Sequence, residues 1–226
     1  MSREITSLLQ NNTFDFLSEL SANNNREWFT EHKTAYLEAK QDVEQFTAAL
    51  IAEATRFDPE LAGLLPKNCL FRIYRDTRFS KDKTPYKTHM GIWLSPSGRN
   101  TGGPGYYLHI APGDSFLAAG LWMPPSDELK AIRQEIDYNG AALKKILGQQ
   151  PFRSFFKGLD EDHVLKTAPQ GYSKDHPDIA LLRLKSFTVS HPLQQAVLTR
   201  PNAVQSVIEG WRAAYPLNQF LRAAIQ

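Results

Sequence analysis

The residues best suited to chemistry lie close together in the middle of the chain, between positions 72 and 87. The basic side chains of this segment are Arg72, Arg75, Arg78, Lys81, Lys83 and Lys87. Two acidic side chains, Asp76 and Asp82, lie among them, so the segment carries a net charge of +4 (six minus two). The whole chain carries +2, and the rest of it therefore sums to −2. The positive charge is confined to one stretch, which indicates a local site rather than a generally basic protein.

Clustered arginines of this kind suit an anionic small molecule. A guanidinium group is planar and offers paired N–H donors that match the oxygens of phosphate and carboxylate groups. The ligands expected for such an anion are Arg72, Arg75, Arg78 and Lys83. Asp76 would orient an arginine or serve as a base, and Tyr86 would donate a hydrogen bond.

Three residues further along the chain are secondary members of this hypothetical site: His176, Arg183 and Lys185. Arg183 and Lys185 are two positions apart, so on a strand their side chains share a face. His176 joins Asp76 and Tyr86 as a weak catalytic candidate, although the sequence does not decide whether the protein is an enzyme. The turn around His176 is rich in metal-capable side chains, but a metal needs three or four converging ligands and no matching spacing occurs elsewhere. We predict neither a metal nor a cofactor.

Two other interpretations of the central segment stay open. In a nucleic-acid-binding protein, Tyr74, Phe79 and Tyr86 would stack on bases beside the basic residues, although the near-neutral net charge argues against this. In a non-catalytic structural or interaction protein, the arginines would pair with Asp76, Asp82 and other acids as a salt-bridge hub. Anion binding predicts that the basic side chains converge on one concavity. A hub predicts arginines buried against carboxylates and no open pocket.

The elements that would position these residues follow from the hydrophobic period. Cys69 to Tyr74 alternates like a strand, which would place Arg72 and Tyr74 opposite Phe71 and Ile73. Four further β-rich runs follow, at residues 89–95, 105–111, 115–123 and 182–190. The first three of them are joined by short connections rich in glycine and proline, which favour an antiparallel meander.

Helical periods occur on both sides of these strands. A short helix over residues 14–20 precedes a long one that ends before Asp58-Pro59, because the residue before proline avoids the α region. Amphipathic helices are expected from Ser126 to Leu147, and a C-terminal helix from Pro201 to Tyr215. We therefore predict one α+β domain over residues 1–226, with a mainly antiparallel sheet and a central meander packed by N-terminal and C-terminal helices.

The charged pattern also resembles that of a known family. The pattern Arg72-x-x-Arg75-Asp76-x-Arg78-Phe79, followed by Asp82-Lys83-x-x-Tyr86, looks like the hallmark of the largely bacterial domain of unknown function 2461. Further segments that fit are Asn25–Phe29, Gly105–Tyr107, Gly120–Pro124, Pro169–Tyr172, His176-Pro177 and Leu182–Phe187. The resemblance spans nearly the whole chain. It implies a single domain, but it does not indicate which reaction, if any, the protein catalyses.

Composition narrows the class of protein. Cys69 is the only cysteine, which excludes a disulfide-built scaffold and favours a buried structural thiol. Residues 1–11 lack the apolar run of a signal peptide, and no stretch approaches the about 20 apolar residues of a membrane span. We expect a cytoplasmic, bacterial-type protein with no membrane partner. The oligomeric state is not predicted.

Overall fold

The computed structural model describes residues 8–96, 98–99 and 102–226. The segment 1–7, part of the stretch in which no signal peptide is expected, lies outside the described residues. The helices are α1 (Asn11–Ala22), α2 (Arg26–Glu31), α3 (Lys33–Ala54), η1 (Pro59–Leu61), α4 (Pro66–Cys69), α5 (Ser126–Gly148), α6 (Gln150–Phe155), α7 (Ile179–Leu182), α8 (Gln195–Leu198) and α9 (Ala203–Ile225). The strands are β1 (Met90–Leu94), β2 (Gly105–Ile110), β3 (Ser115–Leu121) and β4 (Phe187–Leu193).

The strands form one antiparallel sheet in the order β1-β2-β3-β4. Ile92 lies opposite Leu108, and Leu108 lies opposite Leu117, so apolar residues align across the sheet. The long connection from β3 to β4 contains α5, α6 and α7, yet β4 still pairs with β3. The predicted α+β class, with an antiparallel meander packed by helices, is confirmed.

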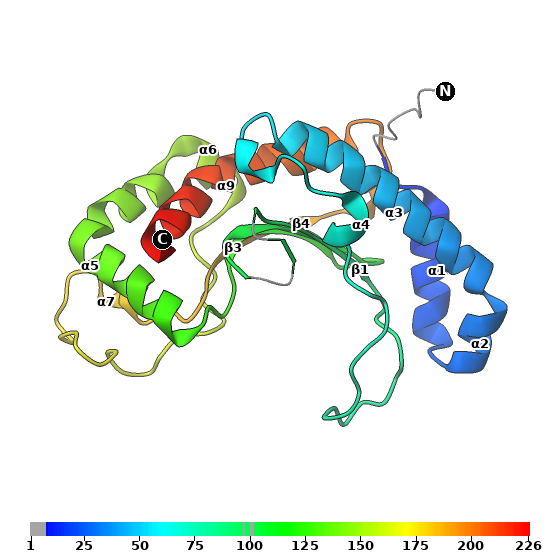
Figure 1. The fold of residues 1–226 in the computed structure, drawn as a ribbon, viewed down its shortest axis with the longest axis horizontal. Coiled ribbons are helices and arrows are strands. Elements are labelled where there is room, and N and C mark those ends of the chain that lie inside the picture. Colours follow the sequence, from blue (N-terminus) through cyan, green and yellow to red (C-terminus); the bar gives the residue numbers. More distant parts are fainter. Residues whose placement is uncertain (1–7, 97, 100–101) are drawn as a thin grey trace.

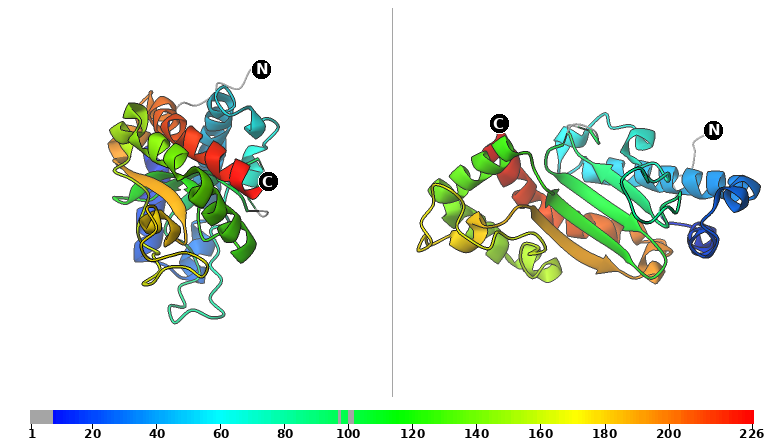
Figure 2. Two further views of the ribbon diagram at one scale, coloured as in Figure 1. Left: turned by 90° about the vertical axis from the view of Figure 1, so that its left-hand side faces the viewer. Right: turned by 90° about the horizontal axis from the view of Figure 1, so that it is seen from below.

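The two faces of the sheet differ sharply. Side chains alternate between faces along each strand, and residues such as Ile92, Leu108 and Leu117 are fully buried beneath the helices. Helix α9 packs against β3 and α3, while α3 also contacts β1 (Figure 1). The opposite face is concave, and none of the described helices covers it, so the described part of the chain has the form of an arch (Figures 1 and 2). Among the described residues, no helix is both long enough and apolar enough to cross a membrane.

Some expected elements begin or end elsewhere. Cys69 is the last residue of α4 rather than the start of a strand, because Pro66 begins that short helix with its φ already fixed. The extended backbone begins at Leu70, which forms an isolated bridge with Ile92. The long N-terminal helix is split at His32, whose backbone (φ −100°, ψ 20°) leaves the helical region. The last strand starts only at Phe187, since the preceding apolar run forms α7. The predicted burial of the Cys69 thiol is confirmed.

A buried ion pair fixes α9 to the rest of the fold. The Arg222 guanidinium donates two hydrogen bonds to the Asp58 carboxylate, at 2.9 and 2.7 Å. The hydroxyl of Tyr106 on β2 donates a third to the same carboxylate, at 2.9 Å. Asp58 and Tyr106 are fully buried and Arg222 is nearly so. This cluster joins the segment after α3, the central sheet and the C-terminal helix.

Removing one partner of this pair should destabilise the protein severely. Arg222→Met leaves the Asp58 carboxylate buried without its cation, and such changes cost about 3–5 kcal/mol of unfolding free energy. Urea denaturation followed by circular dichroism measures the loss. Glu60→Gln is the matched control, because Glu60 is exposed and lies 3.4 Å from the same guanidinium. Equal, small losses in both variants would show that the buried pair does not hold α9.

Candidate functional site on the concave face

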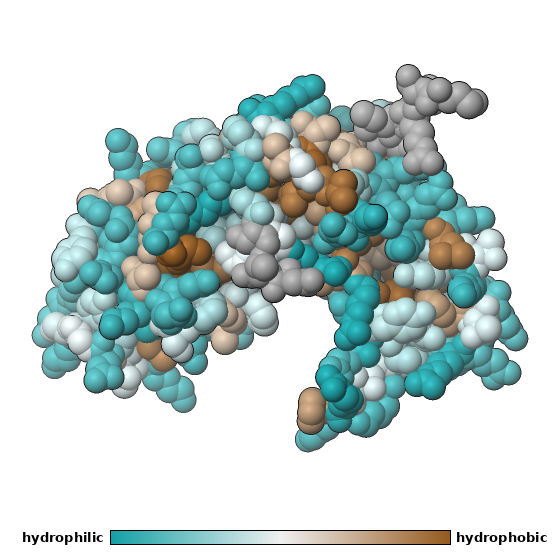
Figure 3. All heavy atoms as spheres, viewed as in Figure 1, coloured by the Kyte–Doolittle hydropathy of each residue, from teal (hydrophilic) through white to brown (hydrophobic). Residues whose placement is uncertain are grey.

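The uncovered face of the sheet forms an open groove of about 580 Å³. Aromatic side chains from three strands and the end of β3 line it: Trp93, Tyr107, Phe116 and Trp122. Polar residues that also line it are Asp114, Asp160, Asp162, Thr188 and Ser190. The hollow lies between a projecting segment of the chain and the lobe that contains α5 and α7 (Figures 1 and 3). We call this surface the groove.

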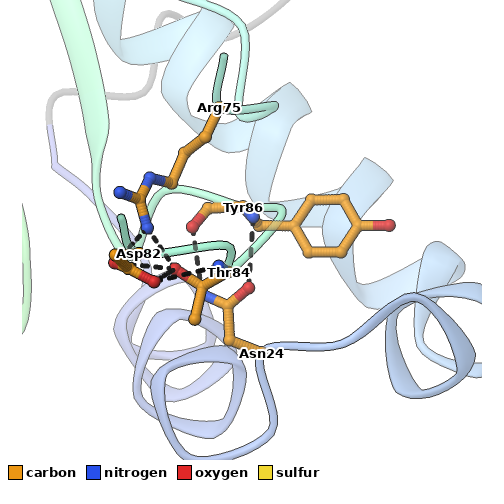
Figure 4. Close-up of polar contacts among 5 residues, drawn as sticks. All are labelled: Asn24, Arg75, Asp82, Thr84 and Tyr86. Carbon is orange, nitrogen blue, oxygen red and sulfur yellow. Dashed lines mark hydrogen bonds and ion pairs between the residues drawn. The ribbon is translucent and has the colours of Figure 1, made fainter. Parts of the chain in front are cut away.

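The projecting segment contains most of the charged pattern found in the sequence. Residues 74–86, here called the arm, leave the edge of the sheet and return to it as an irregular hairpin (Figure 1). Tyr74 and Tyr86 pair at its base. Asn24 exchanges two hydrogen bonds with the backbone of Tyr86, at 3.0 and 3.1 Å, as Figure 4 shows. The Tyr86 ring stacks on Phe29 at 4.0 Å between centroids. The expected hydrogen-bond donor Tyr86 therefore serves to tether the arm to the N-terminal helices.

Ion pairs within the arm engage two of the predicted arginine ligands. Arg75 binds the Asp82 carboxylate at 2.5 Å and also donates to the Thr84 hydroxyl (Figure 4). Arg78 makes a two-pronged contact with Asp76, at 2.9 and 2.7 Å. Hydrogen bonds from the backbone N–H of Thr84 and from Arg75 lower the pKa of Asp82 to about 2.

The hydrogen bonds from Arg78 likewise hold the pKa of Asp76 well below its usual range, which makes this carboxylate a poor base. The third basic residue of the arm that was expected to bind the anion, Lys83, donates to the backbone carbonyl of Thr77 at 2.9 Å. The two arginines and two aspartates of the arm thus pair with one another, and Lys83 binds the backbone of the arm.

The secondary candidates lie on the other side of the arch. His176 contacts the Asp137 carboxylate at 3.0 Å and accepts a hydrogen bond from the Asp178 backbone N–H. The Arg183 side chain donates to the Leu165 carbonyl at 2.6 Å, and Lys185 lies two residues beyond it. These residues flank α7, whereas the arm leaves the opposite end of the sheet (Figures 1 and 2). The structure does not bring them together with the arm.

A second, smaller concavity at the base of the arm gathers basic side chains. It measures about 220 Å³ and its basic lining residues are Lys40, Lys67, Arg72 and Arg99. We call it the basic hollow. Of the predicted ligands, only Arg72 lies in it. Lys67, in α4, is five positions from Arg72, but Lys40 comes from α3 and Arg99 from the β1–β2 connection, so local spacing does not mark the set. Only the tertiary fold brings them together.

The family described as conserved hypothetical protein (DUF2461) matches residues 12–220, which include the arm, the whole sheet and most of α9. The chain belongs to the DUF2461 family. No curated protein and no solved structure matches it significantly.

Two histidines of the DUF2461 chain connect the groove with the basic hollow. The rings of His89 and His109 lie 4.1 Å apart, and the Tyr107 hydroxyl lies 3.0 Å from Nδ1 of His109. Burial, helped by the charges of His109 and Lys87, lowers the pKa of His89 to about 4, while Asp114 opposes the shift. Burial also lowers the pKa of His109 and raises that of Tyr107 to about 12. Near neutral pH these three groups are uncharged, so they form a polar but neutral bridge between the two concavities.

The His89 shift predicts acid sensitivity. The unfolded pKa of histidine is about 6.5, so above that pH the imidazole is neutral in both states and its contribution is constant. Between pH 6.5 and 4 the unfolded chain binds a proton that the folded protein does not bind. The free energy of unfolding therefore falls as the pH drops. His89→Gln should reduce this pH-dependent loss of unfolding free energy. The reduction should be less than about 3 kcal/mol, because solvent screens a partly buried imidazole. Urea denaturation at about pH 7 and 4.5 measures it, and an unchanged slope would contradict the assignment.

Proposed function

We propose that this DUF2461 protein binds a small phosphate- or carboxylate-bearing anion in the basic hollow. The observation that carries the proposal is the composition of the lining: four basic side chains are present and none of the described lining residues is acidic. Lys40 has a carboxylate partner outside the hollow, Glu44, at 3.4 Å. Lys67 and Arg72 are exposed at the opening, where a ligand can reach them.

Electrostatic repulsion at the base of the arm supports the same proposal. Lys87 lies 5.4 Å above the Phe71 ring and Arg99 lies 5.6 Å above it. The pKa of Lys87 is lowered by burial first, and then by the charges of Arg72 and Arg99. Lys87, Arg72 and Arg99 are therefore close enough to repel one another, and two of them, Lys87 and Arg99, lie over the same aromatic ring. A bound anion would relieve this repulsion, and it would favour their charged forms.

The contacts of these cations also support a preorganised site. The Arg99 guanidinium donates to the carbonyl oxygen of Leu70, and the Phe71 ring holds it by a cation–π contact. Arg72 would supply the planar pair of donors that recognises phosphate or carboxylate. Arg75, Arg78 and Lys83, by contrast, maintain the shape of the arm in this proposal. We place the protein in the cytoplasm, in keeping with its single buried thiol.

Titration with inorganic phosphate tests the proposal. Isothermal titration calorimetry at constant ionic strength should detect saturable binding to the wild type. Arg72→Gln should weaken it by at least about tenfold, because a hydrogen bond to a charged group contributes about 1.5–3 kcal/mol. Arg78→Gln is the matched control: it removes the same charge from an arginine of the arm that is paired with Asp76, and it should leave the affinity unchanged.

Two results would contradict anion binding. One is the absence of heat with phosphate, sulfate and citrate. The other is an equal loss in Arg72→Gln and Arg78→Gln, which would reflect general attraction by net charge. Retention of single-stranded oligonucleotides that falls steeply with salt would instead favour the nucleic-acid alternative.

A further inference from the structure

We propose that two copies of this chain clasp each other, with the arm of each copy lying in the groove of its partner. The proposal goes beyond anion binding, because it concerns the tip of the arm and the groove rather than the basic hollow. It rests on three observations: an exposed aromatic tip, a groove of matching chemistry, and the shared direction in which both face.

The tip of the arm presents an apolar side chain to solvent. Phe79 is 94% exposed, the most exposed of the large hydrophobic side chains described. The Arg78 guanidinium lies 5.7 Å from its ring centroid, and Lys81 and Lys83 follow it. The arm carries a net charge of +2, since it holds four basic and two acidic residues. An exposed aromatic ring beside an arginine is typical of an anchor that enters a partner's pocket.

The groove has the complementary chemistry. Its floor is aromatic, through Trp93, Tyr107 and Phe116, and Trp122 on its rim is 67% exposed. The charged residues of its described lining are all acidic: Asp114, Asp160 and Asp162. An aromatic tip with positive charge therefore meets an aromatic floor with negative charge, which steers association and fixes register.

The geometry allows both contacts to form at once. The arm and the groove face the same side of the arch, and the space between the arm and the α5–α7 lobe is open (Figures 1 and 3). Each limb of the arm has about six residues and therefore spans at most about 20 Å. When two copies meet face to face about a twofold axis, each arm enters the other's groove and the assembly closes as a dimer.

The clasp must bury enough surface to be stable. A stable interface buries about 1,200–2,000 Å² in total. Two symmetric contacts would share this area, so each arm and the groove that receives it would contribute about 600–1,000 Å². A 580 Å³ groove is within the range of volumes, about 300–1,000 Å³, that enclose a ligand's surface.

The first experiment measures mass against concentration. Light scattering and sedimentation velocity of the wild type between about 1 and 200 µM should give a dimer, because association depends on protomer concentration. Phe79→Asp should raise the dissociation constant at least about tenfold. Tyr138→Asp is the matched control, since Tyr138 is 73% exposed on α5 and lies in neither the arm nor the lining of the groove. Circular dichroism checks that both variants are folded.

The second experiment tests the pairing of arm with groove. Lys81→Glu and Asp162→Lys should each weaken the dimer, because each places like charges together in both contacts. An equimolar mixture of the two variants should form a strong heterodimer. In this heterodimer the arm of the Lys81→Glu copy meets the groove of the Asp162→Lys copy, so opposite charges face each other again, and the other contact is wild type. If each substitution acted only within its own chain, mixing the two variants would not restore the dimer.

Three results would overturn the clasp: a monomer at every concentration, a dimer that survives Phe79→Asp unchanged, or a mixture no stronger than its components. A monomer would leave the groove to a small ligand instead. Failure of the clasp and failure of anion binding are distinguishable. Phe79→Asp should bind phosphate with unchanged affinity, and Arg72→Gln should retain the wild-type dimer.

Discussion

The rest of the structure depends on one constraint: the helices of the described chain cover one face of a four-stranded sheet and leave the other bare. Helix α9 lies on that face, and the buried contact between Arg222 and Asp58 holds it there. Since side chains alternate along a strand, every second residue of each strand must then face the uncovered side. Those residues include Trp93, Tyr107 and Phe116. Their large aromatic rings make the bare face a hollowed, apolar surface that can bind another group.

The edge of the sheet explains where the charged residues go. Leu70 pairs with Ile92 beside β1, and the chain then leaves the sheet as the arm. Gly91 permits this arrangement, because a Cβ atom there would lie only 2.9 Å from the Tyr107 hydroxyl and 3.0 Å from the Phe71 ring. Phe71 can therefore pack closely on the sheet and present its ring to Lys87 and Arg99. A glycine in a strand thus determines how the cations at the base of the arm are grouped.

The sequence predicted the first three strands well, since glycine- or proline-containing turns follow each of them, whereas the fourth strand, which no such turn delimits, was placed five residues too early. It failed at Cys69, because a four-residue helix has too few positions to display a period. It also identified the arm as the region of interest, but could not tell which arginines are paired. That distinction depends on the hairpin, which places Arg75 next to Asp82, seven positions away. Lys40 and Arg99 were missed for the same reason, since both lie more than 25 positions from Arg72 in the sequence.

One charged segment thus contains two regions with different electrostatics. In the outer part, Arg75 and Arg78 have carboxylates within hydrogen-bonding distance, and exposed pairs of this kind add little to the stability of a protein. They shape the arm without anchoring it. The anchor is at the base, where Tyr86 stacks on Phe29 and binds Asn24. At that same base the cations repel one another. A rigid base beside unbalanced charge suits a small anion, whereas a weakly held, projecting tip suits a larger partner surface.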